Sequence, residues 1–454
     1  MSTRRLKAAK SVSAAPDEFR GVSEWVPVGS LKENPNPTRL HSKKQKQQIA
    51  QSIKRRGFIK PLGVRSNIVF SGNACLAAAI ELGMTEVPVV RLDHLSETEA
   101  RAYAIDDNKL SDNSAFEPVL LTAEMNALVQ SSNEGWDLFA GFEAAEIDNL
   151  FGDHIDPESD PADQLPETNS DTVTQLGDFW QLGQHRLVCG DAKSPDDVSR
   201  LMGKERAAVV FSDPPWNLPT RFFQGRGKIK HADFAEGYGE MSDAAFAKDF
   251  LTPVFKLLAE YSLDGSFHYI CGDYRHIREF LDAGLAAYDE FNNLIVWNKT
   301  VPGLGNPYRS QHELVFLFKK GEAPHQNNIE LGRHGRNRSN IWVFPGATSF
   351  GKGRLDNLAM HPTVKPVAMI VEVLKDASRR RDIVLDLFMG SGSTIMAAER
   401  VGRRAYGIEI SPQFVDVAIR RWQDFTKRDA ILLPTGQTFE EVMKVRSKAG
   451  RRPK

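Results

Sequence analysis

Cysteine is scarce in this chain and is not arranged in pairs. The 454 residues include three cysteines, Cys75, Cys189 and Cys271, which lie far apart and form no C-x-x-C motif. This spacing argues against a disulfide framework or a zinc site, and we expect no metal. It is typical of a protein from a reducing compartment, so a cytoplasmic location is expected.

Net charge and long apolar runs are also lacking. The formal net charge is -1, from 58 Lys and Arg against 59 Asp and Glu, so binding to nucleic acid must depend on local basic patches. No apolar run approaches the length of a membrane span, and the basic start is not followed by the apolar core of a secretory signal, so no membrane partner is expected. Hydrophobic content of 41% predicts a soluble globular protein, long enough for two or three domains.

Residues 209–216 read V-V-F-S-D-P-P-W. The apolar half predicts a buried strand of a parallel sheet, and the two prolines end it at Asp213 because they cannot donate to a ladder. Ligands of open α/β sheets bind at this carboxyl edge of the strands. Asp213 and the carbonyl of Pro214 could each accept a hydrogen bond from an amino group, while Trp216 offers a face on which a base could stack. The alternative is an ordinary strand exit, formed by Pro214 and Pro215, with a buried tryptophan.

Residues 383–394 read I-V-L-D-L-F-M-G-S-G-S-T and precede a helical run. This order predicts a strand, a glycine turn and a helix start, where a cofactor can approach the backbone closely and a negative group is favoured. A further strand, 404–409, ends in Glu409, where such folds place a ribose-binding acid. The glycine spacing differs from that of the dinucleotide motif.

Together, D-P-P-W, the H-P-T-V-K-P run at 361–366, D-x-F-x-G-S-G-S-T and Glu409 resemble the amino-methyltransferases of DNA. The order of the motifs resembles the permuted β-type group, over roughly residues 173–430. The resemblance implies a doubly wound α/β sheet and S-adenosylmethionine as cofactor. It implies catalytic roles for Asp213, Pro214, Pro215 and Trp216, and cofactor contacts for Asp191, Lys365, Asp386, Phe388, Gly390, Gly392, Thr394 and Glu409. For Asp191 a helix N-cap is an equal alternative.

The reaction implied is methyl transfer to an exocyclic amino group of double-stranded DNA. In this family an acid at the first position of the motif goes more often with N6 of adenine, and a serine more often with N4 of cytosine. Asp213 therefore favours adenine, with N4-cytosine as the alternative. A methyltransferase acting on RNA or protein is a rival interpretation, and so is a non-enzymatic DNA-binding protein of the partition type. A homodimer is compatible with the sequence, which does not determine the oligomeric state.

Two basic stretches are candidates for contact with DNA. Residues 217–240 combine glycines with cations, and residues 321–352 hold a second group of arginines. Arginine can hold phosphates or pair with guanine. The expected DNA-binding residues are Arg221, Arg226, Lys228, Arg333, Arg336 and Arg338. A solvated surface loop is the alternative for the first stretch.

The N-terminal part resembles the ParB/sulfiredoxin-like domain, a small α+β fold. The resemblance rests on G-F-x-x-P-L-x-V and S-G-N-A-C-L-A-A-A-I-E-L-G, although Gly72-Asn73-Ala74-Cys75 lacks the family's phosphate-binding arginines. We expect an accessory role in DNA binding or assembly. The expected boundaries are 22–110 for this domain, 111–152 for a helical extension packed on it, 153–172 for an acidic, proline-containing linker, 173–435 for the methyltransferase domain and 436–454 for a basic tail.

Overall fold

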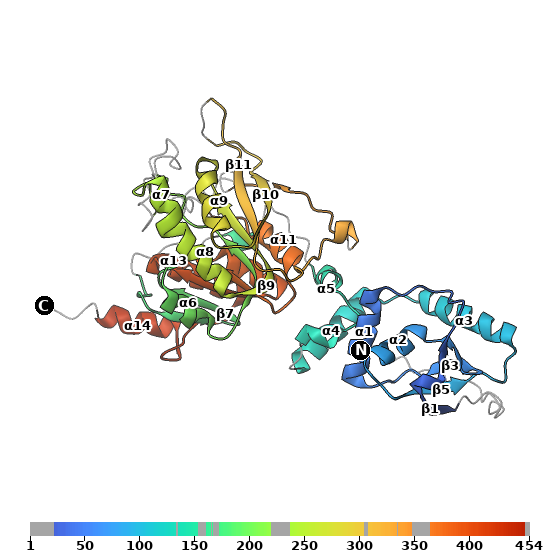
Figure 1. Ribbon diagram of the computed structural model, residues 1–454. Coiled ribbons are helices and arrows are strands. Elements are labelled where there is room, and N and C mark those ends of the chain that lie inside the picture. The colour runs from blue at the N-terminus through green and yellow to red at the C-terminus, as the bar shows by residue number, and fades with distance from the viewer. Residues whose placement is uncertain are drawn as a thin grey trace. The chain divides into compact units, whose positions relative to one another are not determined.

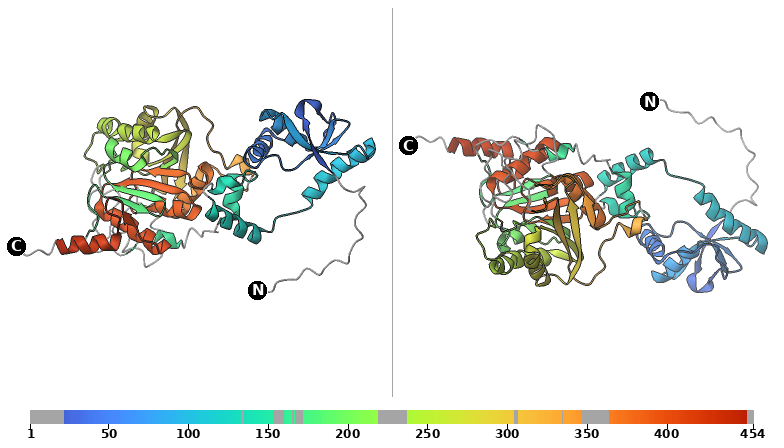
Figure 2. Two further views of the ribbon diagram at one scale, coloured as in Figure 1. Left: turned by 90° about the horizontal axis from the view of Figure 1, so that it is seen from below. Right: turned by 90° about the horizontal axis from the view of Figure 1, so that it is seen from above.

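The computed structural model describes residues 22–132, 135–152, 160–164, 166, 172–218, 237–303, 307–333, 335–346 and 364–449. The chain divides into two compact units, residues 1–143 and 144–454 (Figures 1 and 2). Among the described residues, no helix has both the length and the apolar character needed to cross a bilayer.

Unit 1 contains a five-stranded mixed sheet in the order β1-β5-β3-β4-β2. Helix α2 begins after Gly72, whose positive φ of 94° suits glycine; an added Cβ would lie 2.6 Å from the Leu62 side chain. A small core forms around Leu62, Val69 and Leu76. The elements are β1 (Ser23–Pro27), β2 (Lys32–Glu33), α1 (Lys43–Arg56), β3 (Leu62–Arg65), β4 (Ile68–Ser71), α2 (Asn73–Glu81), β5 (Glu86–Arg91), α3 (Glu97–Asp112) and α4 (Pro118–Ser131).

The predicted helical extension belongs to both units. The segment after α4 bonds to unit 1, since Arg56 donates to the carbonyl of Leu138. Helix α5 (Ala144–Leu150) instead packs in unit 2, where Asp148 pairs with Arg403 at 2.6 Å and both side chains are almost fully buried. The expectation that this whole extension packs on the first domain is therefore wrong for α5, because its buried acid requires a cationic partner.

Unit 2 is built on an eleven-stranded sheet in the order β12-β10-β11-β9-β8-β13-β14-β7-β6-β15-β16. Its centre, from β9 to β7, is parallel, and antiparallel pairs flank it. The strands are β6 (Phe179–Leu182), β7 (His185–Cys189), β8 (Ala207–Ser212), β9 (Ser262–Gly272), β10 (Glu290–Asn298), β11 (His312–Lys319), β12 (Ile341–Val343), β13 (Ile383–Asp386), β14 (Arg404–Glu409), β15 (Ile431–Leu432) and β16 (Gln437–Thr438).

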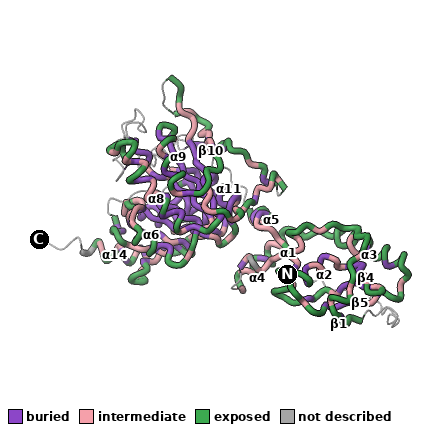
Figure 3. The backbone as a smooth tube through the Cα atoms, in the orientation of Figure 1, coloured by how far each residue is buried: buried purple, intermediate pink, exposed green. Residues whose placement is uncertain are grey.

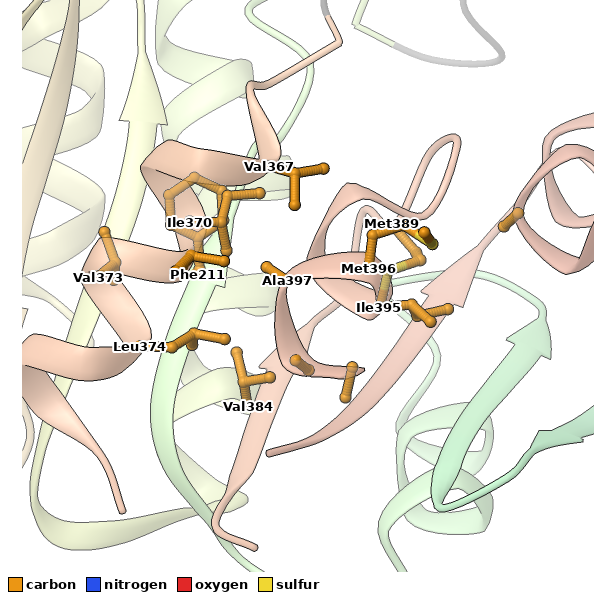
Figure 4. Packing of buried hydrophobic residues seen from close by; sticks show 14 of the residues in the cluster. Phe211, Val367, Ile370, Val373, Leu374, Val384, Met389, Ile395, Met396 and Ala397 are labelled. Carbon is orange, nitrogen blue, oxygen red and sulfur yellow. The ribbon is translucent and has the colours of Figure 1, made fainter. Parts of the chain in front are cut away.

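Helices cover both faces of this sheet. Along β8 the side chains alternate: Val209 and Phe211 belong to one core, while Val210 belongs to the core on the other face. Figure 4 shows Phe211 beside Ile370 and Val384 beside Leu374 in the first core, and Figure 3 shows the buried interior. The first core involves α11 (Val367–Ala377), α12 (Ser393–Val401), α13 (Pro412–Thr426) and α14 (Phe439–Ala449); the second involves α6 (Pro195–Met202), α8 (Thr252–Glu260) and α9 (Ile277–Leu285). The expected doubly wound sheet, preceded by a small α+β domain, is confirmed.

The acidic segment expected to be a solvated linker is packed where it is described. Asp160 is 2% exposed and pairs with Arg400, and Asp163 is 3% exposed and accepts a hydrogen bond from the Val367 amide at 2.9 Å. Arg421 donates two bonds to the carbonyl of Ala162. The acids of this short piece are thus anchors for unit 2, because buried arginines need carboxylate partners.

Candidate active site

Acidic side chains follow four neighbouring parallel strands. Asp213 follows β8, Asp386 ends β13 and Glu409 ends β14, while Asp191 lies two residues beyond β7. The strands are adjacent in the order β8-β13-β14-β7, so their carboxyl ends meet at one edge. The sequence motifs that lie far apart along the chain therefore share one edge of the sheet, where open α/β folds bind ligands.

Asp386 joins the two main motifs. Its Oδ1 accepts hydrogen bonds from Ser212 Oγ at 3.2 Å and from the Phe388 amide at 3.0 Å. Its Oδ2 accepts one from Thr394 Oγ1 at 2.7 Å. Burial raises the pKa of Asp386 to about 6. Asp386 and Thr394 are 3% and 2% exposed. Through these hydrogen bonds they hold the glycine turn after β13 against the end of β8.

The glycine turn after β13 is closed by Glu409. One carboxylate oxygen accepts the Gly390 amide at 2.8 Å and the other accepts the Ser411 amide at 2.9 Å. Burial raises the pKa of Glu409 to about 7. Gly390 and Gly392 have φ of 53° and 85°, and Gly392 caps α12. A Cβ on Gly392 would lie 2.9 Å from that of Ala418, so both conformation and space favour glycine.

Asp191 forms the turn that leads into α6. Its Oδ1 accepts the Lys193 amide at 2.8 Å. The N-cap of α6 is Ser194, which accepts the Asp197 amide, so Asp191 is not the cap. The capping alternative is thus wrong, and a cofactor contact for Asp191 stays a prediction.

Asp213 lies in a charged cluster that is largely shielded from solvent. Lys365 Nζ lies 2.5 Å from Asp213 Oδ2 and 3.4 Å from Glu313 Oε2, and Lys299 Nζ lies 3.1 Å from Glu313 Oε1. The Lys365 side chain is 5% exposed and that of Asp213 is 18% exposed. Burial raises the pKa of Asp213, opposed chiefly by the charge of Lys365. Asp213 Oδ1 is buried and accepts no hydrogen bond from the part of the chain that the structure describes.

Trp216 is less accessible than its motif suggests. It is 7% exposed and belongs to a hydrophobic core that includes Leu218 and Phe246. The Lys365 ammonium lies 5.1 Å from the centre of its ring. An open stacking face was expected, but the alternative of a buried tryptophan describes this side chain better, because apolar neighbours and a cation already surround the indole.

Two residues of this cluster were missed by sequence reasoning. Glu313 is in β11, and Lys299 follows the antiparallel partner β10. Only the strand pairing brings them together, so no local motif marks them. The available signal was a charged residue beside an apolar run in each strand: Glu313 near the start of β11 and Lys299 directly after β10. Lys365 contacts Asp213, and its expected contact with the cofactor stays a prediction.

The predicted DNA-binding residues divide into three groups. Arg221, Arg226 and Lys228 are outside the described residues, as are His361, Pro362 and Thr363 of the second motif. Arg336 is 9% exposed and lies 2.5 Å from Asp376 of α11, and Arg338 pairs with the same carboxylate at 3.1 Å. In this arrangement Asp376 of α11 pairs with both guanidinium groups, and the DNA contacts expected of Arg336 and Arg338 stay predictions. Arg333, with a side chain 59% exposed, pairs with Glu330 at 3.1 Å.

Comparisons with known proteins found two matching families. Residues 207–420 match the model described as "DNA methylase", and residues 4–109 match "ParB N-terminal domain". The type II methyltransferase M.HpaI of Haemophilus parainfluenzae is 25% identical over 254 residues, covering 52% of this chain and 73% of that protein. The type II methyltransferase M2.MboI of Moraxella bovis is 24% identical, covering 48% and 81%.

Solved structures with similar folds were also found. A DNA modification methylase from Thermus thermophilus, complexed with S-adenosyl-L-methionine, is 22% identical and covers 53% of this chain and 93% of its own, with a TM-score of 0.36. The cytosine-N4-specific PvuII DNA methyltransferase is 14% identical and covers 62% and 95%, with a TM-score of 0.42.

Proposed function

Since the chain carries a DNA methylase domain of the N6/N4 amino-methyltransferase family behind a ParB N-terminal domain, we propose that it methylates N6 of adenine in double-stranded DNA. The methyl donor is S-adenosylmethionine. The preference for adenine rests on the acid at the first position of D-P-P-W, Asp213, which in the related family accompanies adenine more often than cytosine.

The glycine turn fits such a cofactor. Gly390 has no side chain to cover the backbone, and α12 begins after Gly392, where the first amides of a helix have no partner within the helix and favour a carboxylate. Each oxygen of Glu409 accepts one amide, which leaves lone pairs for ribose hydroxyl groups. Asp191 and Phe388 lie on the neighbouring turns and would contact the adenine end. When bound, the cofactor supplies an electrophilic methyl group.

The chain's own groups prepare the amino nitrogen. Asp213 Oδ1 is a buried acceptor with no bond from the described residues, and it suits one N–H of the amino group. The Pro214 carbonyl accepts the other N–H. This carbonyl lies just past the end of β8, where Pro214 and Pro215 stop the strand. These two bonds direct the nitrogen lone pair, which is otherwise delocalised into the ring, towards the methyl group. Most of the acceleration comes from this alignment. Trp216 forms a wall of the site rather than an open platform.

DNA reaches the site by way of the loops at the carboxyl edge of the sheet. The target base must leave the duplex, at a cost of a few kcal/mol that pocket contacts offset. The basic residues Arg221, Arg226 and Lys228 remain our candidates for phosphate contacts, together with the exposed Arg333. The ParB-like unit adds DNA affinity or assembly.

The Ser212–Asp386 hydrogen bond gives this proposal its main support. It joins the residue before Asp213 directly to the first acid of the glycine turn. An amino-binding corner and a cofactor turn are thereby held on adjacent strands, as transfer between them requires.

Product analysis tests the proposal. The full chain is incubated with duplex DNA and methyl-labelled S-adenosylmethionine. The DNA is then digested to nucleosides, which are identified by mass spectrometry. We expect N6-methyl-2′-deoxyadenosine, which should be absent with Asp213→Ala. N4-methyl-2′-deoxycytidine alone would overturn adenine as the target base but not methyl transfer to DNA. Label found only in RNA or protein acceptors, tested in parallel, would overturn DNA as the substrate, and activity unchanged in Asp213→Ala would overturn the mechanism.

A further inference from the structure

Lys365 lies between two carboxylates that belong to different strands. Its Nζ contacts Asp213 Oδ2 at 2.5 Å and Glu313 Oε2 at 3.4 Å. Glu313 is held from its other side by Lys299 at 3.1 Å. The side chains of Lys365 and Glu313 are 5% and 11% exposed, so water screens these charges poorly. The four side chains therefore contact one another in the order Lys299, Glu313, Lys365, Asp213.

This order leaves one oxygen of Asp213 unused. Lys365 occupies Oδ2, and Oδ1 is the buried atom that accepts no hydrogen bond within the described ranges. The Trp216 side chain also stabilises the charged carboxylate. With Oδ2 fixed, the carboxylate cannot rotate freely, so the direction in which Oδ1 accepts a hydrogen bond is set by the ammonium group.

Other titratable groups around Asp213 come from each neighbouring strand. Asp386 ends β13, Cys271 is in β9 and Glu313 is in β11. The pKa of the Cys271 thiol is raised well above its ordinary value by burial, so it is neutral. The pKa of Glu313 is lowered, with the charges of Lys365 and Lys299 opposing the effect of burial. Lys365 is the cation that contacts both Asp213 and Glu313.

We propose that Lys365 is a positioning residue for methyl transfer to the amino group: anchored by Glu313, it fixes Asp213 Oδ2, so that Oδ1 accepts the amino hydrogen of the target base. This rests on the proposed function, and it assigns to Lys365 and Glu313 a role in aligning the nucleophile rather than in holding the cofactor.

The charges predict a pH signature. Without Lys365, Asp213 loses an attractive charge and keeps the repulsion of Glu313, so its pKa rises. Because the ionised carboxylate is the stronger acceptor for the amino hydrogen, the activity of this variant would be lost at a higher pH as the solution is acidified. An opposite charge at contact distance typically moves a carboxyl pKa by about one to three units. Removing Glu313 alone takes away its repulsion, so the pKa of Asp213 falls and the acidic limb moves to a lower pH.

Four proteins test this: the unmodified chain, Lys365→Met, Glu313→Gln and the double variant. Methyl transfer to duplex DNA is measured as kcat and KM across pH, together with the affinity for S-adenosylmethionine and the melting temperature. We expect Lys365→Met to lower kcat by about 100-fold and to shift the acidic limb of kcat upward by about one unit or more. The double variant should shift that limb back, because the repulsion is gone. Cofactor affinity should change less than three-fold, which is roughly 0.6 kcal/mol.

The outcomes separate this proposal from the proposed function. A Lys365→Met protein with weaker cofactor binding, an unchanged kcat and an unmoved pH limb would overturn the positioning role while leaving the methyltransferase intact. The positioning role would also be overturned if the acidic limb of kcat lay at the same pH in Lys365→Met and in the double variant. If Lys365→Met does not fold, the Glu313→Gln variant provides the test. An acidic limb of kcat that stays at the pH of the unmodified chain in Glu313→Gln would contradict the charge argument. An unmodified chain that methylates no acceptor overturns both proposals.

Discussion

At the scale of single residues, Glu409 has a structural role in the glycine turn and a proposed role in binding the cofactor. Burial raises its pKa to about 7, and its two oxygens already hold the amides of Gly390 and Ser411. Below this pH the group is neutral in the folded chain, and above it the carboxylate is ionised. Hydroxyl groups bond more strongly to an ionised acceptor. The affinity for a ribose-bearing cofactor should therefore rise as pH increases through about 7.

We predict that S-adenosylmethionine binds the unmodified chain about five-fold more tightly at pH 8 than at pH 6, from the difference between charged and neutral hydrogen bonds. Glu409→Gln stays neutral and should bind weakly at both values. Isothermal titration calorimetry of both proteins across this range measures the effect. The cofactor's own titration is common to both, so an equal pH dependence in the two proteins would contradict the role of Glu409.

Gly392 tests the shape of the cofactor turn. Gly392→Ala forces a side chain into a φ of 85° and brings its Cβ within 2.9 Å of that of Ala418. We expect a loss of about 2 kcal/mol in stability and a clear loss of cofactor affinity. Gly436→Ala is the matched control, since its φ is 71° but nothing lies within 4 Å of the added atom. Thermal melting and calorimetry compare them, and equal effects would show that space around Gly392 is unimportant.

At the scale of elements, α11 is tied to the stretch before β12 by buried arginines. Arg336 contacts both Asp376 and Glu372, while Arg333 forms an exposed pair with Glu330. Breaking a buried pair leaves a carboxylate without its full compensation, whereas an exposed pair contributes little. Arg336 and Arg333 lie in the same basic stretch, but removing Arg336 should lower the stability of unit 2 whereas removing Arg333 should change it little.

We expect Arg336→Ala to destabilise unit 2 by about 3 kcal/mol, lowering the melting temperature by roughly 8 °C. Arg333→Ala should cost under about 1 kcal/mol and should weaken DNA binding instead. Melting curves and salt-dependent DNA titrations separate the two. A stable Arg336→Ala protein with specifically weakened DNA binding would restore the DNA contact that the sequence suggested.

Local sequence identified the elements that carry continuous motifs. Asp213, Asp386, Gly390 and Glu409 were located because each ends a strand or begins a turn, and the residues that produce this are neighbours in sequence. The pairing of Lys365 with Asp213 and Glu313 could not be read in this way, because strand order brings these residues together. The burial of Arg336 was missed, and that of Trp216 was only the alternative interpretation, for the same reason: exposure depends on which other parts of the chain pack over a side chain.

At the scale of the whole molecule, the boundary between the units is set by buried charges. Composition suggested a linker at 153–172, yet Asp160 of this segment pairs with Arg400 inside unit 2. Asp148, from the predicted helical extension, pairs with Arg403 in the same unit. The Arg403 side chain is 0% exposed, so it cannot exchange its carboxylate for water. Unit 2 therefore begins at residue 144, where the two compact units divide.

Two fragments distinguish these boundaries. We predict that residues 144–454 fold and retain kcat for methyl transfer, with a higher KM for DNA if the ParB-like unit adds affinity. Residues 173–454 leave Arg403 and Arg400 without Asp148 and Asp160, at a cost of about 3 kcal/mol or more for each buried pair, so this fragment should melt more than about 10 °C lower. Asp148→Ala in the full chain isolates one pair and should reproduce part of the loss. Equal melting of the two fragments would mean that water or rearranged neighbours compensate the arginines and that the unit begins at residue 173 after all.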